Sequence, residues 1–238
     1  MILKQAEHYL DNQKRLKLAM AFVIGASKNI QQVIRYYINR EKDLHETEHA
    51  VKKLEERIYT CSSIEELMAI EGNTREYYYK AFDNIIDKPD FKFQQRTKRP
   101  PQNFLNTLIS FGNSLMYTIV LSEIYRTHLD PRIGFLHATN FRRFTLNLDV
   151  AEIFKPMIID RVIFTLLGRN MITKDDFEKA TQGLIMKENA QKIFVQELEN
   201  KLQTTFNHMT LGKNVSYRRL IRLELYKLEK HLIGEEEY

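Results

Sequence analysis

The sequence predicts an all-α protein built as one multi-helix domain, and three observations carry that prediction. Its 238 residues include only eight glycines and five prolines, whereas a sandwich or barrel needs turn residues about every 8–12 positions. Apolar residues recur at helical spacing in the N-terminal third, as in Leu16, Ala19, Val23 and Ile30. The length suits one large domain.

Helix breakers and capping patterns divide the chain into its predicted elements. Up to Tyr59 we expect long charged helices with a break near Gly25. Ser63 and Glu66 have the form of a capping box, which predicts a short helix from there to Gly72. Thr173 begins a second capping pattern. The later helices are predicted over Asn73–Ile86, Gln102–Thr127, Asp149–Leu167, Lys187–Phe206 and Ser216–Leu232.

Two segments between these helices are predicted to be irregular. The stretch Asp87–Pro101 contains three prolines and five Lys or Arg residues, which indicates a basic surface loop. Residues Ile133–Leu136 are expected to be extended and to lead into a polar loop before the next helix. We expect a single domain over 1–238, with 1–60 as a linker and first helices and 61–238 as the core.

Charge and cysteine content narrow the functional class. The formal net charge of +5 and the isoelectric point near 9.1 favour a polyanionic partner. The single cysteine, Cys61, excludes an internal disulfide and a cysteine metal cluster, and it fits a reducing, cytoplasmic compartment. The N-terminus lacks a secretory segment and we expect no apolar run near the ~20 residues of a membrane span, so no membrane partner is predicted.

One constellation of residues has the composition of a metal site. Asp149 and Glu152 are three positions apart, so they share a helix face, and His137 precedes them across a loop that can fold back. Carboxylates with an imidazole suit Mg²⁺ or Mn²⁺. Neighbouring cations suited to phosphate oxygens are Arg142, Arg143 and Lys155. Spacing alone leaves open a plainer interpretation, in which Asp149 caps a helix with Glu152 and His137 is an ordinary buried histidine.

Four stretches together carry a resemblance to a known family. They are Leu129-Asp130-Pro131-Arg132-Ile133-Gly134-Phe135-Leu136-His137 continuing through Asn140-Phe141-Arg142-Arg143-Phe144 to Leu148–Pro156; Ile70-Glu71-Gly72 with Arg75 and Tyr78; Arg99-Pro100-Pro101 leading into Asn106–Tyr117; and Ser216–Glu224. These stretches follow one another along the chain in the family's order, and over essentially its whole length the sequence resembles the CRISPR-associated integrase family. Its members are endonuclease subunits that capture foreign DNA as new spacers.

The resemblance implies a site, a reaction and partners. The family's metal ligands, for Mg²⁺ or Mn²⁺, fall on Glu71, His137 and Glu152, with Asp149 at a second acidic position beside the metal. These four would be the catalytic residues, and 61–238 the metal-site core. The implied reaction is a transesterification, in which the 3′-hydroxyl of a foreign DNA fragment attacks a phosphodiester at the edge of a CRISPR repeat. The implied partners are both DNAs, a small ferredoxin-like acquisition protein and a second copy of the chain.

Further residues are expected to contact DNA. Asn103, Asn106, Ser110, Asn113 and Tyr117 form an uncharged polar stripe on one helix, which suits either a nucleic-acid pocket or a self-satisfied buried ladder. Three arginines near the C-terminus are expected to bind backbone phosphates: Arg218, Arg219 and Arg222. The resemblance and the stripe together give these candidates: Arg75, Asn113, Tyr117, Asn140, Arg142, Arg143 and Lys155.

Two other functions remain open from the sequence. His45, Glu46 and His49 satisfy the H-E-x-x-H pattern of zinc metallohydrolases, although charged flanks indicate a solvated helix. A non-catalytic helical DNA-binding or adaptor protein would show DNA binding without cleavage or joining.

Members of the family usually begin with a β-rich N-terminal domain, and we expect that domain to be absent here, because the sequence starts at what corresponds to the linker after it.

Overall fold

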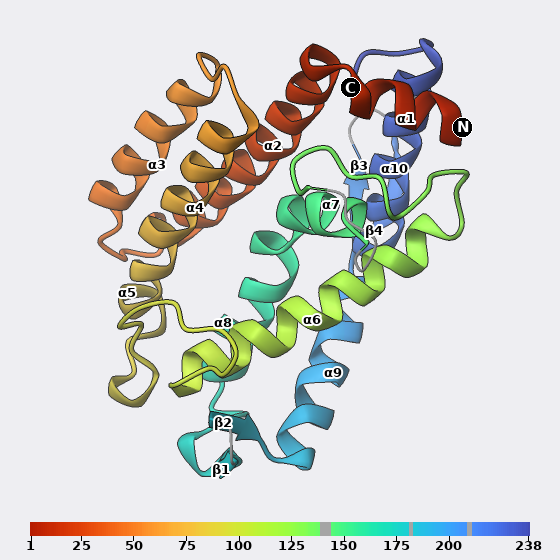
Figure 1. Cartoon of the computed structure of the whole chain (residues 1–238). Coiled ribbons are helices and arrows are strands. Elements are labelled where there is room, and N and C mark those ends of the chain that lie inside the picture. The colour runs from red at the N-terminus through yellow and green to blue at the C-terminus, as the bar shows by residue number, and fades with distance from the viewer. Residues whose placement is uncertain (139–143, 181–182, 209–210) are drawn as a thin grey trace.

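Helices dominate the part of the chain that the computed structural model describes, residues 1–138, 144–180, 183–208 and 211–238 (Figure 1). The α-helices are α1 (Ile2–Leu10), α2 (Asn12–Ile38), α3 (His45–Ile58), α4 (Ile64–Lys80), α5 (Phe82–Ile86), α6 (Phe104–Ile124), α7 (Leu146–Phe154), α8 (Arg161–Gly168), α9 (Glu188–Gln203) and α10 (Tyr217–Ile233). The short turns are η1 (Pro89–Phe91), η2 (Pro156–Asp160) and η3 (Lys174–Asp176).

Two β-hairpins correct the all-α prediction. Strand β1 (Phe177–Ala180) pairs antiparallel with β2 (Gly183–Met186), and β3 (Thr205–His208) pairs antiparallel with β4 (Lys213–Ser216). Each strand has four residues, too few for a period of two to emerge from the sequence. Gly183 and Gly212 adopt positive φ angles of 121° and 61°, which glycine allows at turns.

Two glycines expected to interrupt helices lie inside them. Helix α2 runs unbroken through Gly25, where a Cβ atom would come within 3.6 Å of the Ile153 side chain of α7. Helix α4 continues through Gly72 to Lys80. A glycine inside a helix costs about 1 kcal/mol relative to alanine, and the buried side chains on both sides of it outweigh that cost.

Three predicted helix starts are confirmed by their capping bonds. The Ser63 hydroxyl accepts the Glu66 N–H at 3.2 Å at the start of α4. The Ser216 hydroxyl accepts the Arg219 N–H at 3.2 Å at the start of α10. Thr173 forms a reciprocal capping box with Asp176 at η3. Each side chain satisfies a backbone donor that the helix itself leaves unpaired.

The helix predicted over Asp149–Leu167 is divided by a π-helical turn. Helix α7 ends at Phe154, and η2 follows with a hydrogen bond from the Asp160 N–H to the Lys155 carbonyl at 3.0 Å. Pro156 opens this turn without a backbone N–H to donate. Such turns are rare and often lie at functional sites.

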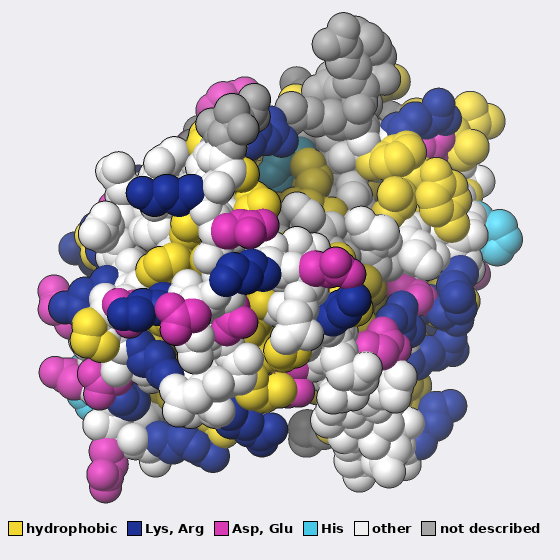
Figure 2. Space-filling view, turned by 90° about the horizontal axis from the view of Figure 1, so that it is seen from below, with side chains coloured by type: hydrophobic (Ala, Val, Ile, Leu, Met, Phe, Trp, Pro, Cys, Tyr) yellow, Lys and Arg dark blue, Asp and Glu magenta, His cyan; other side chains and the backbone are white. Residues whose placement is uncertain are grey.

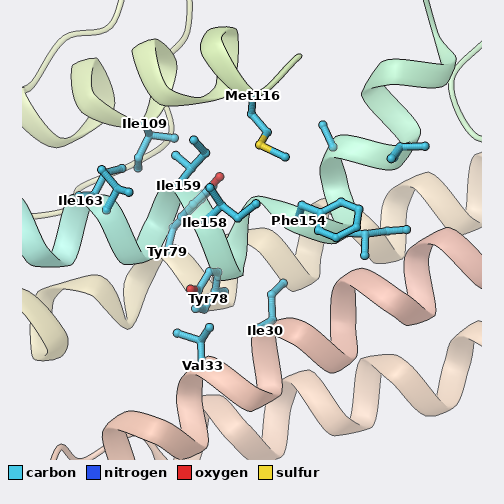
Figure 3. Close-up of a cluster of buried hydrophobic side chains, with 14 of the residues drawn as sticks. Ile30, Val33, Tyr78, Tyr79, Ile109, Met116, Phe154, Ile158, Ile159 and Ile163 are labelled. Carbon is cyan, nitrogen blue, oxygen red and sulfur yellow. The ribbon is translucent and has the colours of Figure 1, made fainter. Parts of the chain in front are cut away.

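The hydrophobic core surrounds η2. Its side chains converge from α2, α4, α6, α7, η2 and α8 (Figure 3). A Cβ atom on Gly112 of α6 would lie 2.5 Å from Ile159 Cγ2 and 2.9 Å from Phe194 Cζ. Because only glycine fits there, α6 lies close against both η2 and α9, and η2 is held between α2 and α6.

Helix α6 corrects the expectation about membrane spans. By length and composition alone this 21-residue helix could cross a membrane, and half of its most apolar window is buried in the protein. The core helix of a soluble protein has the same properties.

On the face shown in Figure 2, Lys and Arg side chains are interspersed with Asp and Glu side chains.

Candidate active site

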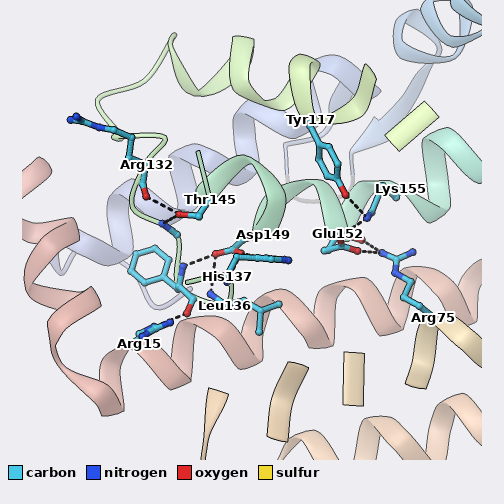
Figure 4. Close-up of polar contacts among 12 residues, drawn as sticks. Arg15, Arg75, Tyr117, Arg132, Leu136, His137, Thr145, Asp149, Glu152 and Lys155 are labelled. Atoms are coloured by element: carbon cyan, nitrogen blue, oxygen red, sulfur yellow. Dashed lines mark hydrogen bonds and ion pairs between the residues drawn. The ribbon is translucent and has the colours of Figure 1, made fainter. Parts of the chain in front are cut away.

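Helices α4 and α7 bring together two of the predicted metal ligands, Glu71 and Glu152. The Arg75 Nη2 donates to Glu152 Oε2 at 2.6 Å and to the Glu152 carbonyl at 2.8 Å. The Arg75 Nε donates to Glu71 Oε1 at 3.3 Å. Lys155 donates to the other Glu152 carboxylate oxygen (Figure 4). The two carboxylates therefore share one buried guanidinium, and Glu152 is bound by two cations.

The predicted third ligand, His137, is held by Asp149. The Asp149 carboxylate accepts the backbone N–H groups of Phe135, Leu136 and His137 at 2.5, 3.0 and 3.1 Å. The His137 Nδ1 lies 2.7 Å from Asp149 Oδ1. Because a carboxylate only accepts, Nδ1 carries the proton and Nε2 is left for another partner. Asp149 thus fixes both the ring and the backbone of the histidine.

A glycine makes this arrangement possible. A Cβ atom on Gly134 would lie 2.7 Å from the Thr145 carbonyl carbon and 2.8 Å from Asp149 Oδ2. The Gly134 N–H also donates to the Thr145 hydroxyl at 2.9 Å. The stretch before His137 therefore lies directly against the start of α7, as irregular backbone and not as a strand.

Burial and the charges of neighbouring side chains shift the pKa values of the site residues. Burial, and then repulsion from Glu152, raise the pKa of Glu71. Burial opposes the charge of Glu152, but Lys155 and Arg75 outweigh it and lower its pKa to about 2. Burial likewise opposes protonation of His137, and the hydrogen bond and charge of Asp149 outweigh it, so the pKa lies above its ordinary value of 6.5.

The donor chemistry fits a divalent cation, although the ligands do not form a ready-made set. Within the described ranges no three His, Cys, Asp or Glu side chains converge as a metal-binding group. Glu71 and Glu152 are neighbours, and both act on the charge of His137. A cation between the two carboxylates would relieve the repulsion that raises the pKa of Glu71. Each Glu152 oxygen accepts one side-chain hydrogen bond, so each keeps a lone pair that a cation could use.

The predicted pocket residues of α6 lie on the other side of Lys155. The Lys155 Nζ is 3.3 Å from the Tyr117 hydroxyl and 5.2 Å from the centre of its ring (Figure 4). Asn113, one turn earlier, is buried, and its Oδ1 has no hydrogen-bond partner among the described residues. These two residues extend the polar surface of the site along α6.

Comparison with known proteins identifies the family. The model of the family described as CRISPR associated protein Cas1 matches residues 1–200. The chain belongs to the Cas1 family. It is 58% identical to CRISPR-associated endonuclease Cas1 2 of Thermodesulfovibrio yellowstonii over all 238 residues, which cover 72% of that protein. It is 48% identical to CRISPR-associated endonuclease Cas1 of Thermotoga maritima over 236 residues, again 72% of the relative.

Solved structures share the fold. The Cas1 protein of Thermotoga maritima superposes with a TM-score of 0.90 at 44% identity, covering 99% of this chain and 71% of that one. A casposase bound to its integration product superposes with the same TM-score at 21% identity, covering 99% and 69% of the two chains. At that identity the casposase shows the fold alone.

The polar stripe of this Cas1 chain has two roles. Asn106 Oδ1 and the Ser110 hydroxyl accept from the two terminal nitrogens of Arg96 at 2.9 and 3.1 Å. The stripe therefore fastens the basic loop to α6 at one end and reaches Lys155 at the other. The loop also carries Lys98, whose pKa is lowered by burial and by Arg96 and Lys155. The sequence placed Lys98 in this basic loop, but nothing in its spacing indicated that it lies near Lys155.

Several predicted DNA contacts are placed differently by the structure. Arg75 is buried between the carboxylates instead of facing solvent. Arg222 binds the buried Glu123 of α6 at 2.6 Å, and Arg218 binds Glu199 at 2.8 Å. Asn140, Arg142 and Arg143 lie outside the described residues. The H-E-x-x-H residues His45, Glu46 and His49 are exposed at the start of α3, as a solvated helix predicts.

Asp160 is a buried carboxylate that the sequence did not single out. It lies beside Arg75 and Tyr78, yet neither of its oxygens has a hydrogen-bond partner among the described residues. Burial raises its pKa from 3.8 to about 7, against the attraction of Arg75. The folded state therefore holds a proton that the unfolded chain releases between these two values, so stability falls as pH rises through that window.

Asp160→Asn is expected to stabilise the protein in a pH-dependent way. The gain should be roughly 1.5 kcal/mol at pH 5 and should reach about 4 kcal/mol at pH 8. Urea denaturation at both pH values measures it. If Asp160→Asn changed the free energy of unfolding equally at the two pH values, the raised pKa of Asp160 would be contradicted.

Proposed function

We propose that this chain is a metal-dependent DNA endonuclease and integrase of CRISPR spacer acquisition, which joins foreign DNA 3′ ends to CRISPR repeat DNA by transesterification. The supporting observation is the pair formed by partly buried Glu71 and buried Glu152 beside His137, in a family whose relatives are named CRISPR-associated endonucleases. The proposed partners are the two DNAs, a small ferredoxin-like acquisition protein and a second copy of the chain. The proposed location is the cytoplasm.

The ligands in this proposal are Glu71, His137 and Glu152, for Mg²⁺ or Mn²⁺. Bound there, the cation supplies Lewis acidity, which favours ionisation of the attacking 3′-hydroxyl and stabilises charge on the leaving oxygen. Asp149 keeps the His137 ring oriented through Nδ1. In the reaction one P–O bond forms as another breaks, so the number of phosphodiesters is unchanged and no nucleotide is consumed.

Two cations of the chain are suited to the attacked phosphate. Arg75 and Lys155 both donate to Glu152, so each would lie close to a phosphate bound at the proposed metal site. Both are buried, where a charge-assisted hydrogen bond to a phosphate oxygen is stronger than in water. Lys155 is also in contact with Tyr117, which offers a hydroxyl on the same side. These groups position the DNA and stabilise charge, and no covalent protein intermediate is required.

A branched-DNA cleavage and joining assay tests this function. With Mn²⁺ the parent protein should cleave and join, and EDTA should abolish both reactions. His137→Ala should reduce joining by about 100-fold or more while DNA binding stays within about threefold, because the imidazole serves the reaction and not the backbone contacts. Joining that survives EDTA would refute the metal dependence. DNA binding without any cleavage or joining in the parent would favour the adaptor alternative.

A further inference from the structure

A cationic cavity lies between α8 and α9, away from the candidate active site. Its volume is about 120 Å³, and Arg161 and Lys201 line it together with Thr165, Asn200 and Thr204. Glu71, His137 and Glu152 are not among the described residues that line it. The cavity is too small for a base pair and large enough for a single phosphate group with a few waters.

The two cations in this cavity are not neutralised by ion pairs among the described residues. The Nη1 of Arg161 is buried without a hydrogen-bond partner among the described residues. Neither Arg161 nor Lys201 forms an ion pair in that part of the chain, although Glu197 also lines the cavity. Burial, and then the charge of Arg161, lower the pKa of Lys201 to about 8. Two positive groups are thus held close together in a partly desolvated place.

Tyrosines hold these cations in position. The Arg161 guanidinium lies 3.8 Å from the centre of the Tyr36 ring, whose other neighbour is Arg40 at 3.6 Å. The Lys201 ammonium lies 4.1 Å from the centre of the Tyr217 ring. Cation–π contacts fix a charged group without neutralising it. Arg161 and Lys201 therefore keep their positive charges, which an anion could neutralise.

Neutral donors complete the cavity. The Asn200 Oδ1 accepts from Gln196 at 3.0 Å, which leaves the Asn200 amide nitrogen as a donor. The Thr204 hydroxyl donates to the Asn200 carbonyl at 3.0 Å and keeps its lone pairs for water. A guanidinium, an ammonium and an amide that converge on one small cavity are the groups that proteins use for phosphate.

We propose that this cavity binds one phosphate group between Arg161 and Lys201, carried either by a free nucleotide or by a DNA strand. The site is distinct from the proposed reaction centre, so its test does not depend on joining activity. Inorganic phosphate is the first probe, titrated into the full chain at constant ionic strength and followed by calorimetry and by thermal unfolding. The parent should bind phosphate and gain thermal stability.

Two cavity variants and two control variants test the proposal. Lys201→Gln and Arg161→Gln should each weaken phosphate binding at least tenfold. Lys192→Gln, at an exposed lysine of the same helix that already pairs with Glu188, should leave it unchanged. Glu71→Gln should also leave it unchanged, which separates this cavity from the active site. Lys201→Gln removes an ammonium that makes no ion pair among the described residues, so we expect it to fold even if Arg161→Gln does not.

Two further probes identify the source of the phosphate. If a deoxynucleoside monophosphate binds and a short single-stranded oligonucleotide binds parent and Lys201→Gln equally, the ligand is a free nucleotide. If oligonucleotide affinity falls in Lys201→Gln and inorganic phosphate competes with the strand, the ligand is a DNA phosphate. Either result supports the site. Phosphate binding that is absent from the parent, or equal in the parent and Lys201→Gln, would overturn it.

Discussion

Glu71→Gln is expected to reduce DNA joining by about 10³-fold while the protein becomes no less stable. The amide keeps the shape of the side chain but loses the negative charge that a divalent cation requires. Burial and Glu152 already disfavour that charge in the folded protein, since they raise the pKa of Glu71. Removing it therefore relieves repulsion at neutral pH, and activity and stability should change in different directions.

Glu152→Gln should separate the two carboxylates experimentally. It should lose joining to a similar extent, but it should also lose roughly 3–5 kcal/mol of stability, because Arg75 and Lys155 would remain buried without their shared anion. The matched control is Glu76→Gln, on the same helix as Glu71 but exposed and paired only with Lys80. That control should keep both properties. Joining rates under single turnover and urea denaturation measure the pair of effects, and a fully active Glu71→Gln would remove Glu71 from the site.

Asp149→Asn is expected to destabilise the protein by about 3 kcal/mol and to impair joining as well. The carboxylate is fully buried and accepts three backbone N–H groups in addition to the His137 ring. Hydrogen bonds to charged groups contribute about 1.5–3 kcal/mol each. The amide offers one accepting oxygen and turns a donor toward the remaining N–H groups. The His137 ring would also lose the partner that fixes its tautomer.

The control for this substitution is Asp11→Asn at the start of α2. Asp11 also accepts two backbone N–H groups, from Gln13 at 2.9 Å and Lys14 at 3.0 Å, but it is exposed. Asparagine caps helices about as well as aspartate, so its stability should change by less than about 0.5 kcal/mol. An equally small change for Asp149→Asn would show that the buried anchor is dispensable.

The sequence predicted the helices that begin at a cap and missed features that depend on packing. Ser63, Thr173 and Ser216 mark helix starts because each makes a local bond that needs no tertiary contact. Gly25 and Gly72 were read as breaks, yet the helices continue through them because buried neighbours on both sides decide the outcome. The hairpins were missed because each strand has only four residues, the shortest length over which an alternation of apolar and polar residues indicates a strand.

The residue types of the site could be predicted from the sequence, but the contacts between them could not. Spacing grouped Asp149 with Glu152, whereas Glu71 came only from the resemblance, since nothing local connects α4 with α7. Asp149 proved to be the support of His137. The cap interpretation was wrong, because α7 begins at Leu146 with Thr145 as its N-cap and Asp149 lies inside the helix. Arg75 was expected to face DNA, and its burial between two carboxylates follows from the packing of α4 on α7.

The ion pairs around Glu152 have a consequence for how the protein matures. Arg75 and Lys155 neutralise this carboxylate from within the polypeptide. The cost of burying the Glu152 charge during folding is thus offset by two cations of the chain itself. Folding should therefore not depend on the ion proposed for this site. A zinc finger is unfolded without its metal, whereas this protein should reach its full fold with no metal bound.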